Sequence, residues 1–292
     1  MSLAPAVRTT PRRLCRLVSN AGAGLLVVVL LLWWLLPVYN MLLIALDPEG
    51  KTEFTGDIWP SAPTLEAFRG VLFQRYWYLQ DFWHQFGNSF FIGITTMALT
   101  VLISSLAGFA LGRTRLGKGS AISTITLVVY MVPAYFLIIP FYRLMWSYGL
   151  LDSLWAVIAA DVTLALPYAV IILQWYGRLI PMELDEAARI DGASPGQVYM
   201  AIYLPLMAPA LAAVGTFALL TAWNEYLYQF ILLSSPRNKT VAITLATFFD
   251  NEHTPWNYPV AASLLYALPP IVVFFAVRRY IAAGLTLGSV KG

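Results

Sequence analysis

The chain has 292 residues, of which 59% are apolar and only 11% are charged. A soluble domain usually carries about 25% charged residues, so this composition excludes a soluble globular protein and a disordered chain. The formal net charge of +3 is too small to indicate a nucleic-acid partner. A single cysteine, Cys15, excludes an intrachain disulfide, and the distant His84 and His253 suggest no metal site.

Six apolar segments are long enough to cross a bilayer, whose core of about 30 Å needs roughly 20 helical residues. They span residues 21–46, 86–111, 122–146, 154–176, 208–233 and 258–277. The sequence therefore predicts an all-α membrane protein with six transmembrane helices. Prolines inside these segments predict bent or broken helices packed as a bundle; they are Pro37, Pro133, Pro140, Pro167, Pro269 and Pro270.

The distribution of Lys and Arg predicts the orientation of the chain. Most of them fall in the N-terminal segment, in alternate loops and near the C-terminus, and the positive-inside rule assigns those parts to the cytoplasm. We therefore expect residues 1–20 as a cytoplasmic segment, 21–283 as the transmembrane domain and 284–292 as a cytoplasmic tail. The outer side would then hold loop 47–85, acidic and then aromatic, and the polar loop 234–257.

One basic loop resembles a nucleotide-binding motif without fulfilling it. Residues 112–118 read GRTRLGK, but Gly119 stands where a P-loop needs Ser or Thr. A P-loop also follows a strand and opens a helix, whereas this stretch lies between two predicted spans. We expect no nucleotide site here, so any ATP must be used by another chain.

The longest predicted inner loop, residues 177–205, has its own helix signals. Pro181 and the acidic residues after it favour a helix start, and Gly192 favours a helix end. Ser194-Pro-Gly-Gln197 is a capping-box pattern with proline at the first helical position. The sequence of this loop therefore predicts two short helices joined by a glycine turn. The small side chains of Ala187 and Ala188 leave one helix face that the surface of another protein could approach closely.

The same loop resembles the signature of ABC importer permeases. The signature is Glu-Ala-Ala, three residues, Gly, nine residues, then Ile-x-Leu-Pro, and here every spacing is kept. Further similarity, over about residues 20–292, is to the carbohydrate subfamily that includes the MalG subunit of the maltose importer. The matching positions are Glu186-Ala187-Ala188, Gly192, Ile202 and Leu204-Pro205, with Asn88-Ser89, Pro140-Phe141-Tyr142, Ala222-Trp223-Asn224-Glu225 and the ending from Gly284.

The resemblance implies a multi-pass permease subunit with the type I ABC importer fold in a bacterial inner membrane. It would move a sugar or oligosaccharide across that membrane by alternating access. The implied partners are a cytoplasmic ATPase dimer, a second, non-identical permease and an extracytoplasmic solute-binding protein reached by loop 234–257. The chain itself would be non-catalytic and bind no cofactor or metal, with ATP and Mg on the ATPase.

The resemblance also assigns the 177–205 loop as a coupling helix that docks into the ATPase. The residues implied at that contact are Glu186, Ala187, Ala188, Ile190, Asp191 and Gly192.

Two acids stand out within the apolar segments, and their role stays open. Asp161 and Glu225 each lie about eight residues, or roughly 12 Å, inside a span. Carboxylates and aromatic rings suit a sugar path, for which the candidates are Asp161, Trp223, Asn224, Glu225, Tyr226 and Tyr228. Alternatively, Asn224 and Glu225 bind backbone, and Asp161 caps a kink at Pro167. A rival function is an ion-coupled secondary transporter with the two acids as coupling groups.

Overall fold

A computed structural model of the protein describes residues 10–48, 58–113, 119–248 and 255–287. In these ranges all regular structure is helical. The predicted termini 1–9 and 288–292, the core of the P-loop-like stretch and His253 lie outside the described residues. The chain divides into two units, one of residues 1–73 with 255–264 and one of residues 74–254 with 265–292.

The smaller unit contains α1 (Thr10–Leu46), α2 (Glu66–Leu72) and most of α12 (Asn257–Tyr266). The apolar side chains of α1 from Leu25 to Leu36 are exposed, as suits a helix whose solvent is lipid. Packing begins near its C-terminal end, where Ala45 is buried and the Asn257 amide donates to the Asp47 carbonyl at 3.1 Å.

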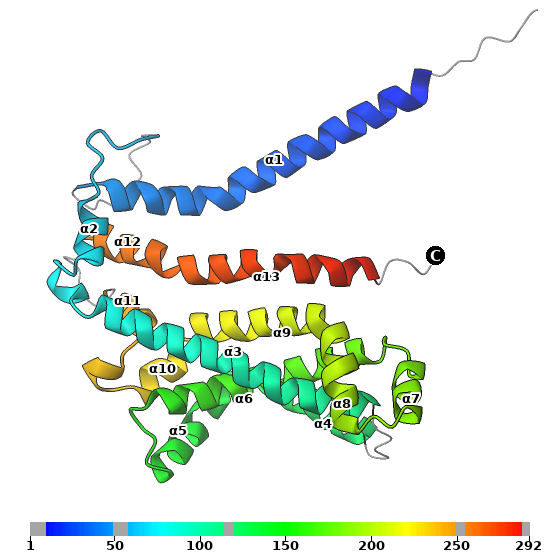
Figure 1. The fold of residues 1–292 in the computed structure, drawn as a ribbon. Helices are drawn as coiled ribbons and strands as arrows, with labels where there is room; N and C mark the ends of the chain where they lie inside the picture. Colours follow the sequence, from blue (N-terminus) through cyan, green and yellow to red (C-terminus); the bar gives the residue numbers. More distant parts are fainter. Residues whose placement is uncertain (1–9, 49–57, 114–118, 249–254, 288–292) are drawn as a thin grey trace, which may run out of the picture. The chain divides into compact units, whose positions relative to one another are not determined.

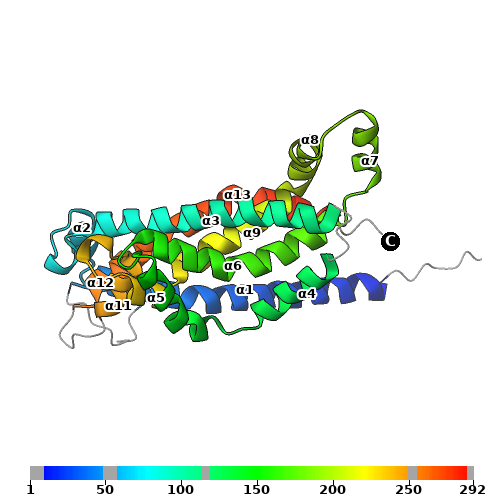
Figure 2. The ribbon, with the colours of Figure 1, turned by 90° about the horizontal axis from the view of Figure 1, so that it is seen from below.

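Three long helices form the core of the larger unit: α3 (Phe82–Arg113), α6 (Leu154–Gly177) and α9 (Leu204–Asn224). They run alongside one another in both views, and α13 (Leu268–Leu287) packs along α9 (Figures 1 and 2). Glycines allow the close approach, because a Cβ on Gly93 would lie 2.9 Å from Leu219 and one on Gly108 would lie 3.0 Å from Leu173.

The predicted span 122–146 is broken rather than continuous. Helix α4 (Gly119–Tyr130) gives way to the 3₁₀ turn η2 (Ala134–Leu137) and then to α5 (Ile138–Ser147), with a bend of 90° between the two halves. Pro133 explains the break, because it lacks an N–H and disfavours helical backbone at the residue before it. The described residues thus hold five continuous candidate spans, or six if the bent pair counts as one.

Both predicted ends of the span 208–233 are wrong. On the N-terminal side, α8 (Pro195–Val198) continues through a π-helical turn, η3 (Tyr199–Tyr203), directly into α9. On the C-terminal side α9 stops at Asn224, Glu225 takes an extended conformation, and the short helix α10 (Leu227–Leu232) follows. No proline marks this second break, so the sequence pattern gave no sign of it.

The two ends of the larger unit carry different short elements. Figure 2 shows α7 (Glu183–Ile190) and α8 projecting away from the α3, α6 and α9 bundle at one of its ends. The opposite end carries α5, α10 and α11 (Val241–Thr247) (Figure 1). Two 3₁₀ turns complete the described elements, η1 (Trp77–Leu79) and η4 (Pro236–Asn238).

Close packing at Gly108 yields a first prediction. A leucine there would push against Leu173 and the Tyr203 hydroxyl, so we expect Gly108→Leu to destabilise the bundle by about 1–3 kcal/mol. Gly87→Leu on the same helix is the matched control, because nothing lies within 4 Å of its added Cβ. The thermal midpoint of the detergent-purified protein should fall only for Gly108→Leu, and an equal fall in both variants would contradict the packing described here.

Candidate coupling segment and polar sites of the bundle

The segment from residue 177 to residue 203 forms the expected helix, turn and second helix. Helix α7 ends at Ile190, and Gly192, two residues further on, has a φ of +87° that only glycine adopts readily. The capping box is complete, since Ser194 Oγ accepts from the Gln197 amide and the Gln197 side chain accepts from the Ser194 amide. The expectation fails only in treating the second helix as separate, because η3 joins it to α9.

The residues assigned to the ATPase contact gather on an exposed surface. Glu186, Ala187, Asp191 and Gly192 are exposed, and Ile190 is 86% exposed. Ala188 is half-buried and instead packs against the apolar cluster around Tyr199 and Tyr203. The structure thus leaves the residues that the resemblance assigns to a partner open to solvent, apart from Ala188.

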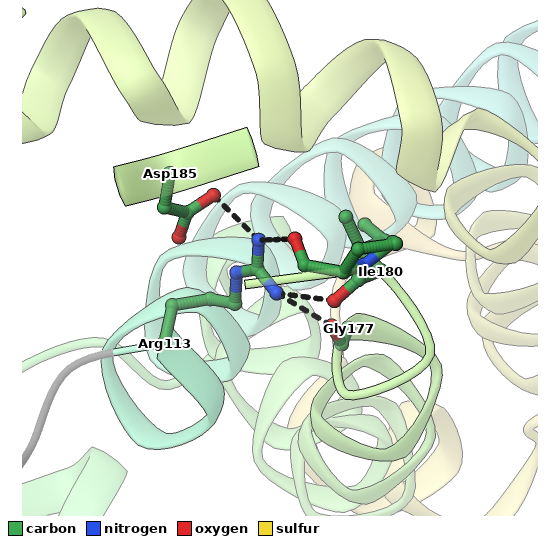
Figure 3. A network of polar contacts seen from close by, with 5 residues as sticks. Arg113, Gly177, Ile180 and Asp185 are labelled. Atoms are coloured by element: carbon green, nitrogen blue, oxygen red, sulfur yellow. Dashed lines mark hydrogen bonds and ion pairs between the residues drawn. The ribbon is translucent and has the colours of Figure 1, made fainter. Parts of the chain in front are cut away.

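Behind that surface, α7 is fixed by a buried ion pair that the sequence did not reveal. The Arg113 guanidinium at the end of α3 donates to Asp185 Oδ1 at 2.5 Å, and both side chains are almost fully buried (Figure 3). Arg113 also donates to the Ile180 carbonyl at 2.6 Å and the Pro181 carbonyl at 3.2 Å. In the sequence, Arg113 is one of several basic residues in the predicted inner loops, and Asp185 is one of three acidic residues at the start of a predicted helix. Nothing in that pattern pairs the two.

A second cluster holds the π-helical turn. The Ser105 and Tyr199 hydroxyls lie 2.7 Å apart, and the Phe109 ring packs edge-on against both Tyr199 and Tyr203. Tyr203 fills the space left by Gly108 and Gly177, with its hydroxyl 3.4 Å from the Leu173 carbonyl. The chain is thus attached to α3 and α6 at both ends of segment 177–203.

Asp161 is fully buried in the middle of α6. Neither of its carboxylate oxygens has a hydrogen-bond partner among the described residues, so it forms no cap at Pro167. It lies close enough to Glu225 for the two groups to interact electrostatically. The structure therefore brings together the two acids that the sequence singled out.

The residues around Glu225 separate into buried and accessible groups. Glu225 closes the break after α9, because its two carboxylate oxygens accept from the Tyr228 and Gln229 amides at 2.8 and 3.0 Å. Trp223 and Tyr228 are buried, and the Tyr228 hydroxyl donates to the Ala134 carbonyl. Asn224 is exposed and Tyr226 is half-buried.

The opposite end of the bundle holds residues 233–248 in place through several anchors. Asp152 Oδ1 accepts from the amides of Ser234 and Ser235, both at 2.9 Å. Asn88 Nδ2 donates to the Arg237 and Lys239 carbonyls, both at 2.9 Å. The segment is therefore a fixed surface element rather than a freely solvated loop. In the sequence, Asn88 stands out only as one of the positions that carry the family resemblance.

These hydrogen bonds also set the ionisation of Asp152. Partial burial raises its pKa, but the Ser234 and Ser235 amides outweigh that effect, and the pKa lies below the usual value of 3.8. Because the folded-state pKa is depressed, the carboxylate contributes stability above the unfolded value, and the contribution is lost as the pH falls through the folded value.

Comparison with known proteins gives consistent matches along the chain. The family described as the inner membrane component of binding-protein-dependent transport systems matches residues 100–287. The maltodextrin transport system permease protein MdxG of Bacillus subtilis is 31% identical, covering 97% of this chain and 99% of that protein. The arabinooligosaccharides permease AraQ of Halalkalibacterium halodurans is 32% identical, with 88% and 91% covered.

A solved structure supports the fold. A chain of a bacterial ABC transporter that imports the acidic polysaccharide alginate matches with a TM-score of 0.76 at 19% identity, covering 95% of this chain and 99% of that chain. The helices and these matches define an integral-membrane permease of the ABC importer class. The chain belongs to the binding-protein-dependent transport system inner membrane component family, and it is a multi-pass inner-membrane protein.

The anchor at Asp152 yields a second prediction. We expect Asp152→Ala to free two amides and loosen residues 233–240 by about 1.5–3 kcal/mol, the usual range for hydrogen bonds to a charged group. Hydrogen exchange at Ser234 and Ser235 should rise while exchange in α6 stays constant. Asp81→Ala, in the turn before α3, serves as the control substitution. Unchanged exchange at the two serines would contradict the anchoring role.

Glu225 yields a third prediction. Gln keeps one acceptor oxygen where the carboxylate has two, whereas Ala keeps none, so α10 should be weakened in the order Ala more than Gln. Exchange at the Tyr228 and Gln229 amides measures this directly. If Gln and Ala variants exchange like the parent protein, Glu225 does not cap α10.

Proposed function

We propose that this chain is the permease subunit of an ATP-driven importer, and that segment 177–205 couples it to a separate ATPase subunit. The observation that carries the proposal is the two-sided construction of α7. Its outer side exposes Glu186 and Ile190, while its inner side is fixed to the bundle through Asp185. A helix attached on one side and open on the other can receive a displacement and pass it on.

In this proposal, closure of an ATPase dimer around ATP displaces α7, and the bundle rocks between inward-facing and outward-facing states. Such rigid-body motion transfers binding energy between distant sites. ATP and Mg are bound by the partner, and this subunit carries out no chemistry. A second, non-identical permease completes the pathway across the membrane.

The proposed cargo is a sugar or oligosaccharide. Two relatives that match 88% and 97% of this chain are named for arabinooligosaccharide and maltodextrin transport. In this chain Asn224 and Tyr226 at the break after α9 are accessible enough to meet a sugar. Trp223 and Tyr228 are buried and Glu225 is committed to two amides, so we assign these three to the support of the break.

The fixed segment 233–248 is the proposed contact for a solute-binding protein. It lies at the end of the bundle opposite α7, as a delivery site on the outer face requires (Figure 1). A matching solved structure is described as an alginate transporter in complex with a periplasmic protein, with a TM-score of 0.65. The fixed position of the segment, anchored by Asp152 and Asn88, would offer that partner a surface of constant shape.

The ion-coupled alternative loses its main support. It needs Asp161 and Glu225 as exchangeable groups, but Glu225 already accepts two backbone hydrogen bonds. Membership of a binding-protein-dependent family also favours an ATP-driven system.

The coupling assignment is tested on the exposed face of α7. We expect Ile190→Asp and Glu186→Arg each to reduce the amount of co-purified ATPase at least fivefold, because one places a charge on an apolar contact and the other reverses a charge. Arg178→Glu is the matched control, since Arg178 is exposed in the same segment but precedes α7. Normal ATPase recovery with both α7 variants would overturn the assignment.

The cargo is tested by uptake into membrane vesicles that contain the co-expressed neighbouring subunits. Maltodextrin and arabinooligosaccharides are the first labelled solutes to compare, with an amino acid as the negative control. We expect uptake of a sugar to require ATP inside the vesicle. Sugar uptake driven by an ion gradient without the ATPase would contradict the proposal.

A further inference from the structure

Helix α7 has too few contacts of its own to hold a fixed position. It has eight residues, and a helix of that length is unstable in isolation. Its aliphatic residues Leu184 and Ile190 are exposed, and Asp185 is its one buried side chain. Besides the half-buried Ala188, which packs against the apolar cluster around Tyr199 and Tyr203, Asp185 is therefore the contact that can fix α7 to the bundle.

The group that meets Asp185 is Arg113, the last residue of α3, which is only 2% exposed. Its guanidinium donates to the Ile180 and Pro181 carbonyls, and it lies 3.4 Å from the Gly177 carbonyl at the end of α6 (Figure 3). One side chain from α3 thus joins the end of α6, the connecting segment of residues 178–182 and helix α7.

The geometry of the pair differs from simple charge neutralisation. Arg and a carboxylate commonly pair through two parallel hydrogen bonds. Here Asp185 receives a single bond, and Arg113 Nε and Asp185 Oδ2 have no partner among the described residues. The two terminal nitrogens are instead shared with backbone carbonyls. A guanidinium can reach acceptors on several sides from a planar fork, whereas an ammonium group cannot reproduce that arrangement.

We propose that Arg113 is a positioning residue that fixes α7 to the ends of α3 and α6, so that a displacement of α7 moves these two helices with it. This inference deepens the proposed function, on which its consequence for transport rests. Without Arg113, α7 would lose its main attachment and would move independently of the bundle. ATP hydrolysis would then drive less transport, and the transported substrate would stimulate hydrolysis less.

The test uses the full permease assembled with its co-expressed partners in lipid nanodiscs. A single Arg113 variant leaves a buried carboxylate unpaired and risks misfolding. The informative variant is therefore the double substitution Arg113→Met with Asp185→Leu. It removes both charges and fills the space they leave with apolar side chains. Arg113→Lys is the conservative variant, and Arg178→Met is the control because Arg178 is exposed nearby.

Hydrogen exchange is the first readout. We expect amides 178–192 to exchange at least tenfold faster in the double variant, while amides in the middle of α3 and α6 keep the exchange of the parent protein. Arg113→Lys should fall between the two, and Arg178→Met should match the parent. Parent-like exchange of residues 178–192 in the double variant would overturn the inference, because the pair would then only neutralise its own charges.

Substrate-stimulated ATP hydrolysis is the second readout, and it separates this inference from the proposed function. Faster exchange of residues 178–192, together with at least fivefold weaker stimulation of ATP hydrolysis, supports both the positioning role of Arg113 and the coupling role of α7. Faster exchange with parent-like stimulation supports the positioning role of Arg113 but contradicts the coupling role of α7.

Discussion

The backbone groups freed at each helix break of the larger unit must be paired inside the protein, because lipid offers no hydrogen bonds. Side chains at the breaks or from neighbouring elements meet this constraint. The Tyr228 hydroxyl binds the Ala134 carbonyl after the Pro133 break, and Glu225 binds two amides after α9. Trp223 and Tyr266 serve each other: the Trp223 indole donates to the Tyr266 carbonyl, and the Tyr266 hydroxyl donates to the Trp223 carbonyl.

Arg113 follows the same rule at the end of α6, and there it also connects the bundle to the proposed coupling helix. The breaks are therefore fixed joints. This is what an importer of the proposed kind requires, since a displacement at one end of a rigid bundle reaches the other end only if its joints hold.

Much of this fold could be predicted from the sequence because its signals are local. Long apolar segments located α1, α3 and α6, and Gly192 with the Ser194 capping box located the turn of the coupling segment. The break after α9 and the Arg113–Asp185 pair could not be predicted. The break has no proline to mark it, although the amides that Glu225 binds are only three and four residues further on. The ion pair joins two side chains that are 72 positions apart. The sugar path stayed undecided because accessibility at Asn224 and burial at Trp223 are tertiary properties.

Position 190 offers the most direct measurement of the central claim, that α7 is the contact between this permease and an ATPase. A photo-crosslinking residue at position 190, in membrane vesicles that contain the co-expressed partner subunits, should link this chain to the ATPase. The same residue at Tyr148, an exposed position beyond α5 at the other end of the bundle, should not. Crosslinking of position 190 only to lipid, or to the ATPase from position 148 instead, would contradict the account.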